Sequence, residues 1–95
     1  MNPDIRPAKI NLMASMLGAV TPNWRAVFLE GKNGKLVATF VLAVDSADDR
    51  EEIADVEFEF CALQPEDEVM TNVVINGGPI SSIANTRHLL FARKE

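Results

Sequence analysis

Apolar positions change their spacing several times along the chain, and each change marks a predicted element. Between residues 5 and 20 they recur every three or four residues, as on one face of a helix. Pro7 suits a first helical turn, and Pro22 disfavours continuation past it. We expect the apolar residues of this helix to be buried; a methionine-lined binding groove is the alternative. The predicted stripe is Ile10, Met13, Leu17 and Val20, with Leu12 and Met16 beside it.

Residues 24–44 predict a β-hairpin, because two apolar runs flank a polar turn that contains Asn33-Gly34. Asn-Gly is the strongest short hairpin signal, since both residues of the turn need positive φ. A two-residue loop at this point sets the register of the two strands. It pairs Lys32 with Lys35, Val27 with Phe40 and Ala26 with Val41.

Strict alternation divides this hairpin into two faces. One face is predicted to carry Arg25, Val27, Leu29, Leu36, Ala38, Phe40 and Leu42. The other is predicted to carry Trp24, Ala26, Phe28, Glu30, Val37, Thr39 and Val41. Neither face is clearly polar, so we expect helices of this chain or a second chain to cover both.

A second helix is predicted to follow, because Asp45 or Ser46 can cap it and acidic residues crowd its first turns. Its apolar face consists of Ile53, Val56, Phe60 and Leu63, with Cys61 at the border. Alternation over residues 56–60 allows a strand instead. We favour the helix because its pattern extends back through the cap, and Pro65 ends it.

Two more strands complete the chain, over residues 69–76 and 88–93, with a turn at residues 76–79 and an irregular connector over residues 80–86. The predicted order is α-β-β-α-β-β. We expect a single α+β domain over residues 1–95, with a four-stranded, mainly antiparallel sheet and two helices packed on one face.

Charge is distributed unevenly along this sequence of net charge −5. Residues 45–68 contain eleven acidic residues and one basic residue, Arg50, whereas the remaining residues are net positive. Nucleic-acid binding is disfavoured because phosphate contacts need a basic surface. An acidic element instead attracts a basic protein partner.

Signals of catalysis, metal binding or membrane association are weak. The single cysteine and the single histidine, Cys61 and His88, could form a nucleophile pair, but no orienting acid is indicated. No spacing typical of zinc, calcium or phosphate sites occurs, so we expect no cofactor, no metal and no enzymatic activity. The apolar runs are too short to span a membrane, and the segment after Met1 lacks the order of an export signal. The lone cysteine fits a reducing compartment, and we expect a cytoplasmic protein.

Three segments resemble a set of small bacterial αββαββ proteins of uncharacterised function. They are residues 17–27 (LGAVTPNWRAV), residues 59–66 (EFCALQPE) and residues 91–95 (FARKE). The resemblance spans nearly the whole chain and implies the fold, with no catalytic or ligand-binding motif. In size and acidity such proteins are similar to immunity or antitoxin partners of bacterial toxins.

Two functional hypotheses follow. The first is a non-enzymatic binding protein, such as an immunity protein, whose acidic second helix masks a basic toxin; a solvated helix face without a partner is the alternative. The predicted partner-binding residues are Asp48, Asp49, Glu52, Asp55, Glu59 and Glu66. The second is a self-associating module that forms a homodimer through the open face of the hairpin. Its predicted contacts are Trp24 and Phe28, although Trp24 could instead close one end of the core.

Overall fold

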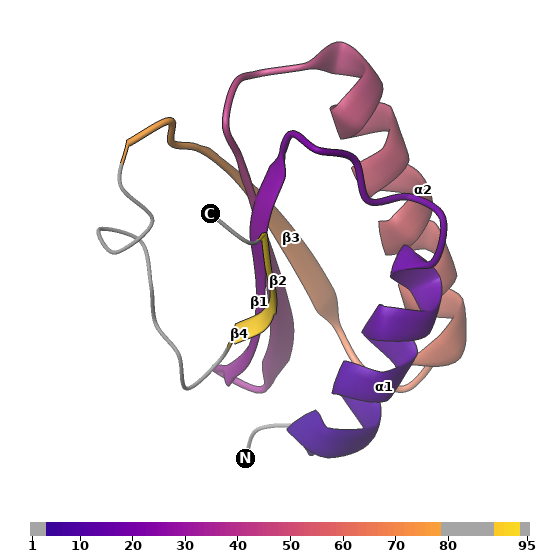
Figure 1. Cartoon of the computed structure of the whole chain (residues 1–95). Coiled ribbons are helices and arrows are strands. Elements are labelled where there is room, and N and C mark those ends of the chain that lie inside the picture. Colours follow the sequence, from indigo (N-terminus) through magenta and orange to yellow (C-terminus); the bar gives the residue numbers. More distant parts are fainter. Residues whose placement is uncertain (1–3, 79–88, 94–95) are drawn as a thin grey trace.

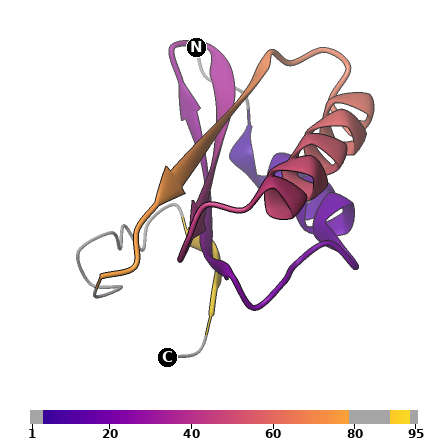
Figure 2. The ribbon, with the colours of Figure 1, turned by 90° about the horizontal axis from the view of Figure 1, so that it is seen from above.

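The computed structural model describes residues 4–78 and 89–93. In chain order the elements are α1 (Ile5–Met16), β1 (Trp24–Lys32), β2 (Lys35–Leu42), α2 (Ala47–Leu63), β3 (Val69–Ile75) and β4 (Leu89–Ala92). The strands form one sheet in the order β3-β2-β1-β4. Both helices cover the same face of this sheet (Figures 1 and 2). The predicted α+β fold and its element order are confirmed.

The hairpin forms in the predicted register. Asn33 and Gly34 both adopt positive φ, at 54° and 78°. Lys32 pairs with Lys35, Val27 with Phe40 and Ala26 with Val41, as expected for a two-residue loop.

At its open end the hairpin departs from strict alternation, so the predicted placement of Trp24 and Arg25 is wrong. The register shifts between Trp24 and Ala26, and Trp24 pairs with Leu42. A shift of one residue exchanges the faces of the side chains beyond it. Trp24 therefore belongs to the core on the helix side of the sheet. Its ring packs edge-on against that of Phe40, with the ring centroids 5.5 Å apart.

The buried face of α1 also differs from the prediction. The core side carries Ala8, Leu12, Ser15 and Met16, whereas Ile10 is 69% and Leu17 82% exposed. Small side chains at positions 8 and 15 allow the helix backbone to approach its neighbours, and the Ser15 hydroxyl donates to the Asn11 carbonyl oxygen at 2.9 Å. The helix ends at Met16, so the periodicity expected through Val20 does not continue.

The second helix forms where predicted, with Ser46 as its N-cap, and the alternative strand over residues 56–60 is excluded. Ile53, Val56 and Phe60 are buried, whereas Leu63 is exposed. Because α2 connects β2 to β3 across the sheet, β3 runs parallel to β2, and β1 runs antiparallel to both β2 and β4. The predicted connector over residues 80–86 and His88 lie outside the described residues.

Candidate protein-binding surface

The orientation of α2 is set by the residues that it buries. Asp49, Ile53, Val56 and Phe60 form the row that faces the sheet and α1. Ser46 begins the helix, and its hydroxyl accepts a hydrogen bond from the Asp49 backbone N–H at 3.3 Å. Capping and burial together determine which side chains of α2 meet solvent.

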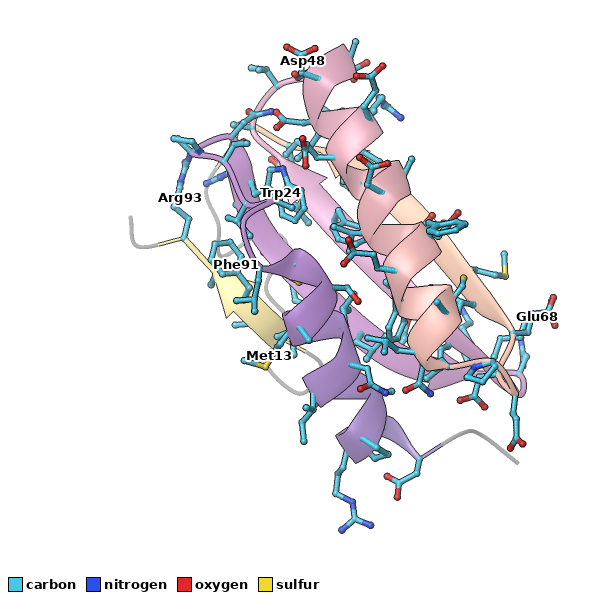
Figure 3. The ribbon with its side chains drawn as sticks, turned by 90° about the vertical axis from the view of Figure 1, so that its right-hand side faces the viewer. Met13, Trp24, Asp48, Glu68, Phe91 and Arg93 are labelled. Atoms are coloured by element: carbon cyan, nitrogen blue, oxygen red, sulfur yellow. The ribbon has the colours of Figure 1, made fainter. Side chains whose placement is uncertain are left out.

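Four exposed carboxylates form a row along α2, which we call the acidic stripe. It consists of Asp48, Glu52, Asp55 and Glu59, and each member directly precedes a member of the buried row. Successive residues of an α-helix are rotated by about 100°, so the stripe lies about that far around the axis from the buried row. Figure 3 shows Asp48 at the outer end of α2. Four of the six residues predicted to bind a partner are therefore brought together on one surface.

The acidic stripe lies on the flank of α2 that is turned away from β3. Glu57 follows the buried Val56, so it lies on the opposite flank of α2 from the acidic stripe. The Glu57 carboxylate accepts a hydrogen bond from the Thr71 hydroxyl of β3. On the other side of α2, the Asn11 side chain of α1 donates to the Leu63 carbonyl oxygen at 3.4 Å. The stripe consequently borders the side of α2 that α1 occupies.

The carboxylates of the acidic stripe are not neutralised by the described part of the chain, where no Lys or Arg lies within ion-pair distance of them. Arg50, the basic residue of this segment, contacts Asp45 instead, at 2.6 Å. The hydrogen bond from Arg50 holds the pKa of Asp45 below its ordinary value. The negative potential of the stripe is thus directed at solvent and at any approaching partner.

The other two residues of the prediction lie apart from the stripe. Glu66 is exposed in the turn that follows α2. Asp49 is 6% exposed and belongs to the buried row. Its carboxylate accepts hydrogen bonds from the Thr21 hydroxyl and the Asn23 amide at 2.8 Å each, and from the Trp24 indole at 3.3 Å.

Sequence reasoning missed this structural role of Asp49. Burial alone would raise its pKa, but the hydrogen bonds from Asn23, Thr21 and Trp24 outweigh burial and lower it. The spacing of Ser46 and Asp49 resembles a capping box and places Asp49 in the first turn of the helix, but it does not indicate burial or the hydrogen bonds from Thr21, Asn23 and Trp24.

The residues predicted for a homodimer contact are also separated. Trp24 is 1% exposed within the core, whereas Phe28 is half-buried on the opposite face of the sheet. A contact between two copies through the sheet face opposite the helices stays a prediction. Of Trp24 and Phe28, Phe28 is the residue that lies on that face.

The structure describes one member of the predicted Cys61–His88 nucleophile pair. Cys61 is exposed rather than at a buried border, and burial of its thiol, together with the charge of Glu57, raises its pKa. His88 lies outside the described residues, which contain no cluster of three or more His, Cys, Asp or Glu side chains arranged to hold a metal ion. A hollow of about 300 Å³ between α1 and β4 is lined by residues without a titratable side chain. They are Met13, Met16, Leu17, Gly18, Val20, Leu90 and Phe91.

Comparison with known families gives a match over residues 8–95 to the MafI2 immunity protein family. The chain belongs to this family. An immunity protein acts against a toxin, so membership of the MafI2 family implies an immunity function and a toxin partner. A comparison with curated proteins finds no match. Neither helix among the described residues has the length and apolar character needed to cross a membrane.

Proposed function

We propose that this protein inhibits a toxin by binding, without catalysis, and that the acidic stripe of α2 contacts a basic surface of that toxin. The observation that carries the proposal is the row of four exposed carboxylates without ion-pair partners in the described structure. Charges in such a row steer a partner of opposite charge and increase the rate of association.

The neighbouring helix supplies apolar contact area for the same interface. Ile10 is 69% exposed on α1, within the same helical layer as the stripe. Interfaces combine a desolvated apolar centre with polar surroundings, and charged residues contribute mainly to rate and specificity. We therefore expect the toxin to present an apolar patch beside its basic surface.

The test is reversal of charge on the stripe, with association to the cognate toxin domain measured at several salt concentrations. The double variant Glu52→Lys/Asp55→Lys should associate about 10- to 100-fold more slowly at low salt, because it removes the attraction that guides encounter. The rate should also respond less to salt than that of the unaltered protein.

A matched control carries the same change in net charge at another place. Asp45→Lys/Glu68→Lys replaces two exposed acids that form surface ion pairs with Arg50 and Lys35. This control should keep most of the association rate. An equal effect of both double variants would show that the association rate depends on net charge alone. An unchanged association rate for the stripe variant would refute the proposal.

A further inference from the structure

The two edges of the sheet differ in how well they resist pairing with another strand. At one edge, β4 has four residues and is followed by Arg93 and Lys94. At the other edge, β3 has seven residues, Val69–Ile75, with no charge and no proline, and its register with β2 has no bulge. Natural proteins protect an exposed edge with charge, proline, bulges or shortness. The described structure shows none of these along β3.

The outer side of β3 presents backbone groups for pairing. The Leu36 N–H donates to the Glu68 carbonyl oxygen at 2.8 Å, and the Asn76 N–H donates to the Leu42 carbonyl oxygen at 2.9 Å. Backbone groups alternate along a strand, so even-numbered residues from 68 to 76 point at β2. The N–H and C=O groups of Val69, Thr71, Val73 and Ile75 consequently point outward, where no described strand pairs with them.

We propose that β3 pairs with β3 of a second copy of this chain, antiparallel and about a two-fold axis at Asn72. In this register Thr71 lies opposite Val73 of the second copy, and Val69 lies opposite Ile75. Each of these pairs occurs twice about the two-fold axis, so four pairs close about eight backbone hydrogen bonds. The two sheets become one continuous sheet, and the unprotected edge is removed from solvent.

Side chains are compatible with this register on both faces of the extended sheet. Met70 lies opposite Val74 of the second copy, and both residues are exposed in the single chain, by 45% and 39%. Asn72 lies opposite its own symmetry mate. Every cross-strand pair is therefore apolar or neutral, and no like charges oppose each other across the axis.

The charges of α2 also favour a second copy as the occupant. The acidic stripe lies on the flank of α2 away from β3, so the pairing does not bring two stripes together. The flank of α2 towards β3 is formed by the residues that follow the buried row. These are Arg50, Ala54, Glu57 and Cys61, which carry one positive and one negative charge. Pairing through β3 also leaves the stripe open to a toxin.

Disulfide crosslinking tests the register directly. Asn72 and Asn72 of the second copy lie opposite each other as a pair without backbone hydrogen bonds between them. The Cα atoms of such a pair are about 4.5 Å apart, and this separation permits a disulfide. In the Cys61→Ser background, Asn72→Cys should give a covalent dimer on mild oxidation. The matched control, Met70→Cys in the same background, should stay uncrosslinked because Met70 faces Val74.

Sedimentation of the full chain at micromolar concentrations tests the association itself. The unaltered protein should sediment as a dimer, and Asn72→Lys should weaken dimerisation about fivefold or more, because it places two like charges opposite each other. Ile10→Lys makes the same change of charge on exposed α1 and should remain dimeric. A monomeric unaltered protein, or crosslinking at Met70→Cys instead of Asn72→Cys, would overturn the proposal. If β3 pairs with a strand of the toxin instead, the unaltered protein alone is a monomer, and this result also overturns the proposal.

Discussion

Asp49 joins three parts of the molecule through one carboxylate. It lies in the first turn of α2, and it accepts hydrogen bonds from Thr21 and Asn23 in the loop after α1 and from Trp24 at the start of β1. The acids around it in the sequence are exposed, so composition alone groups Asp49 with them. Its burial follows from the position of α2 against β1, which no local pattern reveals.

Replacement of Asp49 by Asn should destabilise the fold by about 2–3 kcal/mol at neutral pH, because buried donors lose a charged acceptor. Its pKa is lower in the folded protein than the ordinary value of 3.8. Its stabilising contribution is therefore complete above that value and is lost as the pH falls through the folded pKa. The free energy of unfolding of Asp49→Asn and of the unaltered protein can be measured by urea unfolding between neutral and acid pH. The difference between the two free energies should decrease as the pH falls.

The neighbouring acid provides the control for this prediction. Asp48 is exposed on the acidic stripe, so Asp48→Asn should change the unfolding free energy by no more than about 0.5 kcal/mol. Equal effects at positions 48 and 49 would contradict the role assigned to the Asp49 carboxylate.

Among the elements, the hairpin was the most predictable, because Asn33-Gly34 specifies its turn and the turn specifies the register. The bulge near Trp24 was not predictable, since it depends on the indole reaching both Phe40 and Asp49 in the assembled core. For α1, the spacing of the larger apolar residues predicted a buried face through Ile10, Met13 and Leu17, and this prediction was wrong. Close packing selected the face with Ala8 and Ser15, because small side chains permit a close approach that the larger residues of the other face prevent.

The two faces of α1 give a direct prediction for stability. Leu12→Ala should cost about 2–5 kcal/mol because Leu12 is fully buried, with 0% of its surface exposed. Leu17→Ala, at the residue that ends the helix, should cost no more than about 0.5 kcal/mol. Chemical denaturation of both variants measures the difference. A large loss at Leu17 would contradict the observed orientation of α1.

At the scale of the whole molecule, the order of the strands could not be read from the sequence, because nothing local indicates that β3 lies beside β2 and parallel to it. The lopsided charge, by contrast, was visible in the sequence, and helical spacing was enough to gather four acids on one surface. The two predicted partner-binding residues that lie apart from these four are Glu66, whose position depends on the turn after α2, and Asp49, which belongs to the core.

The proposed toxin contact uses the flank of α2 that is turned away from β3, whereas the proposed dimer contact uses the edge of β3, so the two should be compatible. We expect a complex of two immunity chains with two toxin domains, because dimerisation through β3 leaves both acidic stripes accessible. Light scattering on the purified complex measures this mass. A complex with one copy of each chain would show that toxin binding and dimerisation exclude each other.

The separation of the acidic stripe from the buried row of α2 has a consequence for how this protein can change over generations. Substitutions at Asp48, Glu52, Asp55 and Glu59 alter the exterior of a helix that is held in place by other side chains. Such substitutions leave the interior intact, so the proposed recognition surface can diverge along with a changing toxin while the same scaffold continues to fold.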